Sequence, residues 1–275
     1  MIRLVKFVSE SVSGVGVLLD DGVVPTGYDS MDDFIGDREQ SLDQVRELVD
    51  RHETIPNYQL TTPIEQPSKI LCCGVNYRSH LEENPEATLP EEPFFFSKLP
   101  SSVIGPGEPI PMPYPKCLLD YEVELAVVIG TTAKGIDRTE ALDHVFGYTL
   151  LNDISARDIQ FKDAQITLGK GLDGFSPIGP TIVPRSEMPP LNEIELSTRV
   201  NGNTLQRDYA SNTIFSVPEL IELLSRWITL NPGDIVSTGT PAGVAHFRPD
   251  KPYLKPGDVV EIEATGIGIL RNRVV

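Results

Sequence analysis

From residue 69 onward the chain consists of short β-rich runs separated by Gly and Pro turns, and this succession restricts the fold more than any other feature. The runs are KILCCGV, VELAVVIG, GYTLL, ELSTRVNG, DIVSTG, VVEIEATG and IGILRNRVV. Only one clear helix is predicted among them, so the strand–helix alternation of a doubly wound nucleotide-binding fold is missing. The sequence therefore predicts an α+β, β-rich domain.

Residues 1–65 have a different character and are predicted to form a small N-terminal α/β domain. RLVKFVSE and GVGVLLDDGVVPTG have the pattern of short strands, the latter folded around an Asp-Asp-Gly turn. SLDQVRELVDRH follows, with apolar residues at helical spacing. Because TTPIEQPSK contains two prolines and has the character of a linker, we place the boundary after residue 65 and assign 66–275 to a second, larger domain.

The one clear helix of the larger domain is predicted over VPELIELLSRWITL. Ser216 is a suitable N-cap, and Glu219 stands at the third helical position, which is the spacing of a capping box. Apolar residues follow helical spacing as far as Trp227. We therefore expect the Trp227 ring in the core.

Composition argues against several classes of protein. The 40 Asp and Glu residues outnumber the 23 Lys and Arg residues, and the net charge of −17 would repel a nucleic-acid backbone. No apolar run approaches the roughly 20 residues that span a bilayer, and the first residues lack the apolar stretch of a secretory signal. Three cysteines, two of them adjacent, do not indicate a disulfide framework. We expect a cytoplasmic protein with neither a nucleic-acid nor a membrane partner.

The most informative segment is LLDYEVELAVVIG, residues 118–130. Strand alternation places Glu122 and Glu124 on one face, and the apolar run after them is typical of a strand buried on both faces. Two buried carboxylates repel each other and lose hydration unless a positive charge lies between them. A divalent cation would supply that charge, because Mg²⁺, Mn²⁺ and Ca²⁺ prefer carboxylate oxygens. The alternative is an edge strand whose Glu face lies in water.

A third carboxylate stands at the end of another predicted strand, in GYTLLNDISARDIQ. Asp153 follows the apolar run directly, where a strand end can expose a side chain to a cleft. Together with the two glutamates it would complete an open site of three ligands. The alternative is that Asp153 only caps a helix or an Asx-turn.

The segment 73–93 contains a candidate general base. His80 and Glu83 are three residues apart, so a single helical turn would bring them together, and the carboxylate would raise the basicity of the imidazole. The segment ends in a polar, proline-broken run that could act as a mobile lid. A solvated surface histidine is the alternative.

Two glycine-rich pieces complete the candidates. Lys170 lies between glycines, which lets the backbone approach a ligand closely. In STGTPAGV, residues 237–244, backbone N–H groups and Thr hydroxyls could hold a carboxylate. Either piece could equally be a tight turn. The remaining histidines and the three cysteines lack such company, and we interpret them as structural residues.

Taken in order, these segments resemble the fumarylacetoacetate hydrolase family, in its bacterial-type group with a short N-terminal domain. The matching motifs, which span residues 69 to 275, are GVNYRSH, DYEVELAVVIG, NDISARDIQ, GKGLDGFSPIGP, VNG, GDIVSTGTPAGV and LKPGDVVEIEATGIGILRN. The resemblance implies a mixed β-rich domain with a rolled, barrel-like sheet, a preceding small N-terminal domain and a homodimer. Two departures stand out: Ala245 replaces an expected glycine, and the FFF run before Lys98 is bulkier than usual and would narrow a pocket wall.

The resemblance also implies roles for individual residues. It places the metal ligands at Glu122, Glu124 and Asp153, with Mg²⁺ as the expected cation and Mn²⁺ or Ca²⁺ as alternatives. The catalytic residues that it implies are His80, Glu83 and Lys170. The substrate-binding residues that it implies are Arg157, Gln160 and Thr240.

The reaction that the resemblance favours is hydrolysis of a C–C bond in an acylpyruvate-like or 2,4-dioxo acid. A cation that holds the 2-oxo acid would stabilise the enolate, and His80 with Glu83 would activate water. Decarboxylation of an oxaloacetate-type acid, isomerisation with decarboxylation of 2-hydroxyhepta-2,4-diene-1,7-dioate, and simple tautomerisation use the same enolate. A non-catalytic metal- or ligand-binding protein on the same scaffold is a further alternative.

Overall fold

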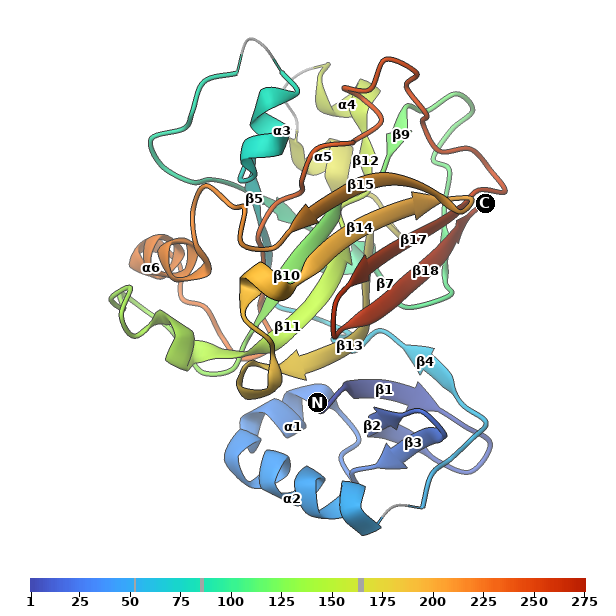
Figure 1. Cartoon of the computed structure of the whole chain (residues 1–275), viewed down its shortest axis with the longest axis vertical. Coiled ribbons are helices and arrows are strands. Elements are labelled where there is room, and N and C mark those ends of the chain that lie inside the picture. The colour runs from blue at the N-terminus through green and yellow to red at the C-terminus, as the bar shows by residue number, and fades with distance from the viewer. Residues whose placement is uncertain (52, 85–86, 163–165) are drawn as a thin grey trace.

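A computed structural model describes the chain apart from residues 52, 85–86 and 163–165, and two mixed β-sheets dominate it (Figure 1). The strands are β1 (Leu4–Val8), β2 (Ser13–Leu19), β3 (Gly22–Pro25), β4 (Gln59–Thr61), β5 (Ile70–Gly74), β6 (Phe94–Lys98), β7 (Val103–Ile104), β8 (Pro109–Ile110), β9 (Leu119–Asp120), β10 (Val123–Ile129), β11 (Val145–Asn152), β12 (Ser155–Ala156), β13 (Ser176–Pro184), β14 (Glu195–Val200), β15 (Asn203–Tyr209), β16 (Ile235–Ser237), β17 (Val259–Ala264) and β18 (Gly268–Val274).

The helices are short and lie around the sheets. The α-helices are α1 (Met31–Gly36), α2 (Arg38–Arg51), α3 (Arg78–Glu82), α4 (Arg157–Gln160), α5 (Ile166–Lys170) and α6 (Val217–Trp227). The 3₁₀ turns are η1 (Pro100–Ser102), η2 (Ala141–His144), η3 (Arg185–Glu187) and η4 (Leu191–Glu193). None of the described helices combines the length and apolar character needed to cross a membrane. The α+β, β-rich prediction is confirmed.

The larger sheet runs in the order β3-β2-β1-β13-β11-β10-β16-β5-β6, with β4 and β7 paired at its side. Its central strands β10, β11 and β13 are buried along their whole length, as the unbroken apolar run after Glu124 predicts. In the described part of the chain this path does not close on itself, so the sheet is rolled but is not a closed barrel.

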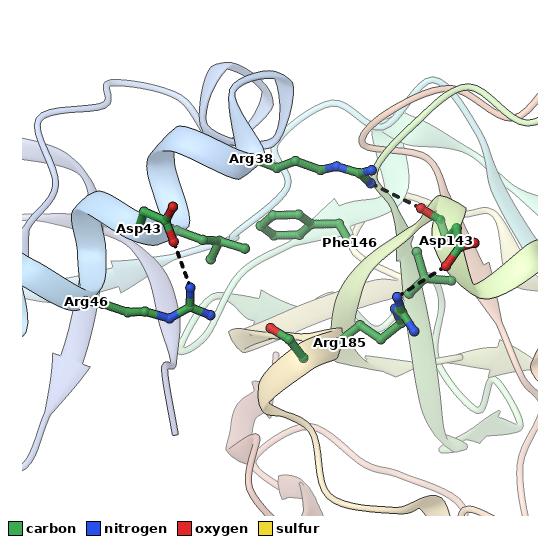
Figure 2. A pocket seen from close by; sticks show the side chains of 9 residues that line it. Arg38, Asp43, Arg46, Asp143, Phe146 and Arg185 are labelled. Carbon is green, nitrogen blue, oxygen red and sulfur yellow. Dashed lines mark hydrogen bonds and ion pairs between the residues drawn. The ribbon is translucent and has the colours of Figure 1, made fainter.

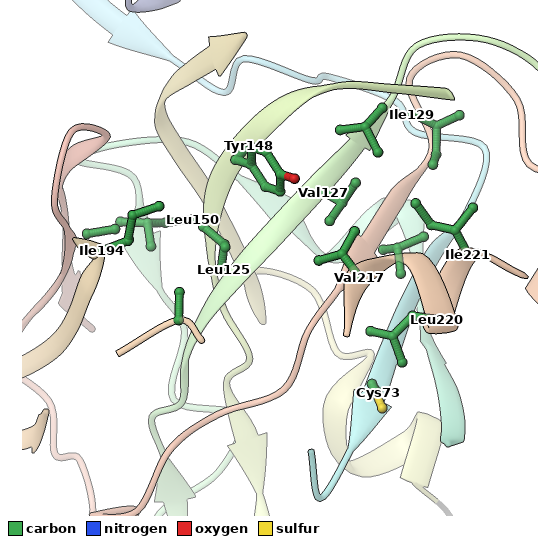
Figure 3. Packing of buried hydrophobic residues seen from close by; sticks show 14 of the residues in the cluster. Cys73, Leu125, Val127, Ile129, Tyr148, Leu150, Ile194, Val217, Leu220 and Ile221 are labelled. Atoms are coloured by element: carbon green, nitrogen blue, oxygen red, sulfur yellow. The ribbon is translucent and has the colours of Figure 1, made fainter. Parts of the chain in front are cut away.

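The second sheet, in the order β15-β14-β17-β18-β8, packs on one face of the first. Leu125 and Val127 of β10 belong to one core with residues of the second sheet, among them Leu196 and Ile262. Figure 3 shows the apolar side of α6, with Val217 and Ile221, facing the same core. Alternation along β10 sends its even-numbered residues to the opposite face. Both faces of β10 therefore lie in apolar cores. Packing on both sides holds in place the strand that carries the candidate metal ligands.

The opposite face of the larger sheet is covered by the N-terminal unit. Phe34 of α1 and Phe146 of β11 share a core, with ring centroids 6.2 Å apart in an edge-on arrangement. Strand β1 pairs with β13 through Leu4 and Ile182, so the two predicted domains share one sheet as well as one core. The structure thus shows how the units pack, while the boundary after residue 65 stays a prediction.

An open cleft of about 550 Å³ separates α2 from the turn η2 at the edge of this contact (Figure 2). Arg38 reaches across it and donates to the backbone carbonyl of Asp143 at 3.3 Å. Arg185 pairs with the Asp143 carboxylate at 3.4 Å, and Arg46 pairs with Asp43 at 2.9 Å. Because these guanidinium groups have partners from the protein itself, we interpret the cleft as a polar rim of the contact between the units.

Helix α6 begins as predicted, but the prediction that Trp227 at its end is buried is wrong. The backbone N–H of Ser216 donates to the Glu219 carboxylate at 2.7 Å, as a capping box requires. Trp227, however, is 75% exposed, so its predicted place in the core is wrong. It is the last residue of the helix, and the described part of the chain leaves most of its surface uncovered there.

Candidate active site

Three carboxylates that are far apart in the sequence lie together at one end of the central strands. Glu124 belongs to β10, Glu122 immediately precedes that strand, and Asp153 immediately follows β11. The two strands are antiparallel, with Val123 opposite Asn152, so the start of one lies beside the end of the other. The Asp153 backbone N–H donates to the Glu122 carbonyl at 2.9 Å, and all three side chains are buried.

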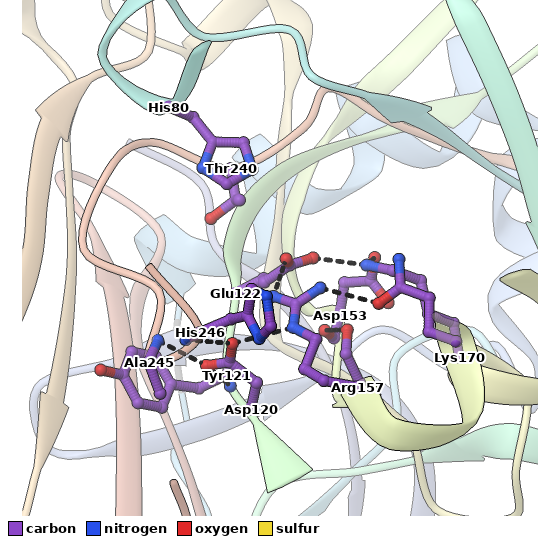
Figure 4. A network of polar contacts seen from close by, with 12 residues as sticks. His80, Asp120, Tyr121, Glu122, Asp153, Arg157, Lys170, Thr240, Ala245 and His246 are labelled. Atoms are coloured by element: carbon purple, nitrogen blue, oxygen red, sulfur yellow. Dashed lines mark hydrogen bonds and ion pairs between the residues drawn. The ribbon is translucent and has the colours of Figure 1, made fainter. Parts of the chain in front are cut away.

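Two buried lysines supply positive charge to this carboxylate cluster, and Figure 4 shows one of them, Lys170, beside Asp153. The Lys170 ammonium lies 2.6 Å from Glu122 Oε2 and 2.5 Å from Asp153 Oδ2. Lys98, at the end of β6, contacts Asp153 Oδ1 at 2.5 Å. Local sequence patterns indicate Lys170 as a candidate but not Lys98, because no local pattern pairs Lys98 with a carboxylate 55 positions away.

Lys170 reaches the cluster because α5 packs very closely against α4. A Cβ atom added to Gly169 would lie 2.7 Å from the Cα of Gln160, which is closer than real Cβ atoms approach such a neighbour. Gly169 is therefore required for steric reasons. The close approach is made to another helix of the protein, so the predicted approach of this backbone to a ligand stays a prediction.

The carboxylates differ in their protonation because their neighbours differ. Burial alone would raise the pKa of Glu122, but the adjacent Arg157 and Lys170 hold that pKa below its usual range. Burial, together with the negative charges of Asp153 and Glu122, raises the pKa of Glu124 well above its usual range. Among the described residues, the hydrogen bond that Glu124 accepts comes from the Ser237 hydroxyl, a neutral donor. Glu124 is thus the carboxylate whose charge the protein itself compensates least.

This donor set fits a divalent cation. Glu124, Asp153 and the buried thiol of Cys72 each offer a ligand atom, and these atoms lie within 4.8 Å of one another. Buried carboxylates with an excess of negative charge are what hard cations bind, and Glu122 extends the same cluster. The sequence analysis interpreted Cys72 only as a small buried residue, but the structure places its sulfur beside two of the predicted ligands.

Arg157 binds the protein's own carboxylates in this structure. Its Nη2 lies 2.5 Å from Glu122 Oε1, its Nε lies 2.9 Å from Asp120 Oδ2, and its Nη1 donates to Gln160 at 3.0 Å. The side chain is buried, and both Arg157 and Gln160 line the pocket described below. The substrate-binding roles implied for these two residues stay predictions.

Asp120 connects Arg157 to the loop after STGTPAGV. Its fully buried carboxylate also accepts hydrogen bonds from the backbone N–H groups of Ala245 at 2.7 Å and His246 at 3.0 Å. The sequence analysis expected a glycine at position 245. Alanine fits because the backbone N–H, which every residue but proline offers, makes the contact. Asp120 itself was missed, since a single Asp before a strand has no distinctive local signal.

Thr240 is held by a buried glutamine from the second sheet. The Gln206 amide nitrogen donates to the Thr240 hydroxyl and to the Pro241 carbonyl, both at 2.8 Å. The Gln206 oxygen accepts from the Val123 backbone at 3.0 Å and from the Thr198 hydroxyl. Gln206 therefore joins the loop that carries Thr240 to the strand that carries the glutamates.

His80 and Glu83 form the pair that their spacing predicts. His80 Nδ1 lies 2.7 Å from Glu83 Oε2, and both side chains are largely buried around helix α3. Glu83 Oε1 in turn accepts a hydrogen bond from the Gly243 backbone at 2.8 Å. The STGTPAGV loop therefore holds a carboxylate of the protein itself, and its role in binding a ligand stays a prediction. The imidazole faces the pocket above Glu122 (Figure 4).

These groups surround one pocket of about 270 Å³. Glu122, Glu124 and Lys170 line its inner end, and His80 lines its other side with Thr240. Four phenylalanines complete the wall, from the FFF run, the end of α4 and the loop after STGTPAGV: Phe94, Phe96, Phe161 and Phe247. The pocket thus combines charged and aromatic side chains, and the FFF run contributes to its wall, with the Phe96 ring centroid 4.8 Å from Lys170 Nζ.

Comparison with known proteins decides the family. The C-terminal domain of fumarylacetoacetate (FAA) hydrolase matches residues 69–275. The chain belongs to the fumarylacetoacetate hydrolase family. It is 39% identical to the mitochondrial oxaloacetate tautomerase fahd2 of Xenopus laevis over 100% of this chain and 90% of that protein. Identity to the oxaloacetate tautomerase YisK of Bacillus subtilis is 45%, over 80% of this chain and 74% of that protein.

Solved structures of this family agree. Fumarylacetoacetate hydrolase from Exiguobacterium antarcticum superposes with a TM-score of 0.87 at 34% identity, over 100% of this chain and 99% of the other. The 2-hydroxyhepta-2,4-diene-1,7-dioate isomerase of Mycobacterium marinum superposes with a TM-score of 0.79 at 32% identity, over 100% of this chain and 98% of the other. Maleylpyruvate hydrolase from Sphingobium sp. SYK-6, in complex with manganese(II) and pyruvate, superposes with a TM-score of 0.82 at 28% identity, over 99% of this chain and 98% of the other. This chain is therefore an enzyme of the fumarylacetoacetate hydrolase superfamily.

Proposed function

We propose that this enzyme interconverts the keto and enol forms of oxaloacetate or a closely related 2-oxo acid, with a divalent cation as cofactor. The observation that carries the proposal is the His80–Glu83 pair, which lies in the same pocket as Glu122 and Glu124. A base on one side and a carboxylate cluster on the other fit a substrate that must lose and regain one proton. The similarity to two oxaloacetate tautomerases supports this reaction over those that break a C–C bond.

The cation would be held by Glu122, Glu124 and Asp153, and Mg²⁺ is the expected ion, with Mn²⁺ or Ca²⁺ as alternatives. When bound, it supplies positive charge beside the 2-oxo oxygen and so stabilises the enolate. The manganese(II) in the complex of maleylpyruvate hydrolase supports a divalent ion in this family. Lys170 and Arg157, already paired with Glu122, would hold the substrate carboxylate near the inner end of the pocket.

The proton transfer itself is assigned to His80. The imidazole takes a proton from the carbon next to the 2-oxo group and returns it, and Glu83 keeps the ring oriented through its contact with Nδ1. The Gly243 N–H fixes Glu83 in turn. Gln160 and Thr240, which line the same pocket, are assigned to substrate binding.

Hydrolysis of a C–C bond, the reaction first expected from the sequence, is the second candidate. The same His80–Glu83 pair could activate water instead of moving a substrate proton. The four phenylalanines of the pocket favour this candidate, since they offer apolar surface to an acyl group that oxaloacetate lacks. Oxaloacetate-type decarboxylation and isomerisation of a heptadienedioate remain alternatives of the same enolate chemistry. We also propose a cytoplasmic homodimer, on the resemblance and the composition.

The proposal is tested by following the decay of enol-oxaloacetate absorbance with the wild type, His80→Ala and a control. His144→Ala is the control because His144 bonds to Thr131 outside the pocket. We expect His80→Ala to lose about 100-fold or more in rate, the usual contribution of general acid–base catalysis, and the control to keep its rate. Full tautomerase activity of His80→Ala would contradict the role of His80. Acid release from acetylpyruvate with no effect on oxaloacetate would favour the hydrolase.

A further inference from the structure

A second pocket, remote from the carboxylate cluster, brings three lysines together around an apolar floor. This pocket of about 330 Å³, here called the lysine cleft, is lined by residues 112, 115–118, 251 and 253–256. Lys116, Lys251 and Lys255 stand on it, a third of the nine lysines of the chain. In a chain with a net charge of −17, such a concentration of positive charge on one concave surface is unexpected.

Among the residues that the structure describes, none pairs with the ammonium group of Lys116, Lys251 or Lys255. Within the described residues, no carboxylate forms an ion pair with any of them, although the chain has 40 acidic side chains. The carboxylates close to the cleft have other partners: Asp158 accepts hydrogen bonds from the Leu118 backbone N–H at 3.3 Å and from the Tyr114 hydroxyl at 2.5 Å. Asp250 pairs with Arg248 at 3.1 Å, and Asp258 accepts a hydrogen bond from the Lys255 backbone at 2.8 Å. The positive charge of the cleft is therefore open to a ligand from solution.

Two of these lysines also occupy backbone conformations that favour glycine. Lys116 has φ of 69° and Lys251 has φ of 41°, and they are two of the four described non-glycine residues with positive φ. Lys116 holds the third position of a turn that the Cys117 N–H closes onto the Tyr114 carbonyl, where glycine or asparagine is preferred. Because glycine is the residue that tolerates such φ values best, both lysines stand where the backbone conformation is strained.

The floor between the lysines is apolar. Leu118 is 37% exposed in the cleft, and Met112, Tyr253 and the buried Leu254 complete its surface. A ligand that matches both properties carries a negative group for the lysines and an apolar body for the floor. A polynucleotide does not fit this description, because its bases and sugars leave little apolar surface and the rest of the molecule repels its backbone.

The cleft is linked to the active site through two short chains of hydrogen bonds. Tyr253 OH lies 2.9 Å from His246 Nδ1, and the His246 backbone N–H donates to Asp120, the residue that holds Arg157. The Leu254 N–H also donates to the Leu119 carbonyl at 2.8 Å, one residue before Asp120. A ligand in contact with Tyr253 and Leu118 therefore touches a residue bonded to His246 and a residue two positions before Asp120.

From these observations we propose that the lysine cleft is a second ligand site, distinct from the substrate pocket, for a small carboxylic acid with an apolar body. The carboxylate lies between the ammonium groups of Lys116, Lys251 and Lys255, and the apolar body covers Leu118 and Tyr253. Because the site contacts the segments around Asp120, its occupation shifts the substrate KM.

Octanoate is the probe, and its binding is measured by calorimetry on the full chain with Mg²⁺ and oxalate present to fill the substrate pocket. We expect saturable binding of octanoate and binding at least about tenfold weaker for octanol, which lacks the charge. This comparison of octanoate with octanol uses the wild-type protein alone, so it does not depend on the folding of a variant. Equal affinity for octanol and octanoate, or loss of octanoate binding when oxalate and Mg²⁺ are added, would overturn the proposal.

Substitutions locate the site. Lys251→Gln, Lys255→Gln and Lys116→Gly, which also relieves the turn, should each weaken octanoate binding about threefold or more, while Lys134→Gln should not. Lys134 is a matched control because it is exposed and donates to the Trp227 carbonyl, outside the cleft. Unchanged binding in all three cleft variants would refute the assignment, as would an unchanged KM for substrate under saturating octanoate.

Discussion

At the scale of single residues, the site is governed by a count of buried charges. Four buried carboxylates, those of Asp120, Glu122, Glu124 and Asp153, share three buried cations, those of Lys98, Arg157 and Lys170. Glu124 is the carboxylate left without a basic partner at hydrogen-bond distance among the described residues. Its raised pKa expresses that deficit, and a bound cation or a proton removes it.

Asp120 offers a prediction at this scale. Asp120→Asn keeps the shape of the side chain but removes the charge that pairs with the buried Arg157 guanidinium. Breaking a buried ion pair from one side costs about 3 kcal/mol or more, because the remaining charge stays buried without compensation. We expect a clearly lower free energy of unfolding in urea, whereas Asp20→Asn, a fully exposed control, should change it little. Equal stability of Asp120→Asn and wild type would contradict the role of Asp120.

The residue scale also shows where sequence reasoning stops. Strand alternation found Glu122 and Glu124, and helical spacing found the His80–Glu83 pair, because both patterns are local. Lys98 and Asp120 were missed because their partners, Asp153 and the backbone at 245–246, are far away in the sequence. Their contacts depend on the tertiary fold, and no spacing rule encodes them.

At the scale of elements, the pairing of strands and the packing of helices place the functional side chains at the site. The antiparallel pair β10–β11 brings Glu122 beside Asp153, and the close approach of α5 to α4 at Gly169 delivers Lys170. Figure 1 shows that α3, α4 and α5 gather at the end of the molecule opposite the N-terminal unit. The functional side chains thus lie at the ends of strands and helices, while the central residues of these elements pack in the apolar cores.

The start of α6 gives a prediction on pH. The Ser216 backbone N–H and the Ser216 hydroxyl lower the pKa of Glu219 below its unfolded value of 4.5. A carboxylate with a lowered pKa stabilises the fold above that value, and the contribution is lost as the pH falls through the folded pKa. Glu219→Gln should therefore lower the Tm at pH 7, by the equivalent of about 1 kcal/mol or less for a partly exposed cap. The difference should disappear in acid, and a difference that does not vary with pH would contradict this account.

The elements were predicted more accurately than their pairing. The hairpin at Asp20–Asp21, the N-cap at Ser216 and the buried run after Glu124 all carry local signals, and the structure confirms them. The pairing of β1 with β13 joins residues about 178 positions apart, and no local pattern predicts it. The predicted burial of Trp227 is wrong for a related reason. Periodicity identifies the apolar face of a helix, but it does not show how far along the helix other elements pack against that face.

At the scale of the whole molecule, the N-terminal unit and the larger unit form one folded body. They share the sheet through β1 and β13 and the core around Phe34 and Phe146. The negative charge of the unit at 1–65 has no part in the proposed chemistry. Its structural contribution is the apolar surface that covers one face of the central sheet.

This shared core predicts a single unfolding transition. Calorimetric and van't Hoff enthalpies of unfolding should agree for the wild type, and Phe34→Ala should lower the stability of the whole molecule by about 3 kcal/mol or more. Val12→Ala, an exposed position in the same unit, is the control and should have little effect. Two separate transitions, with Phe34→Ala lowering only one, would show that the units fold independently.

The central claim, a divalent cation held by Glu122, Glu124 and Asp153, is tested most directly by titrating oxalate, an analogue of the enolate, in a calorimeter. The titration is made with Mg²⁺, with Mn²⁺ and with EDTA, on the wild type and on Glu124→Gln. The account predicts that oxalate binds only when a divalent cation is present and that Glu124→Gln weakens this binding by about tenfold or more. Oxalate that binds the wild type equally well in EDTA would contradict it.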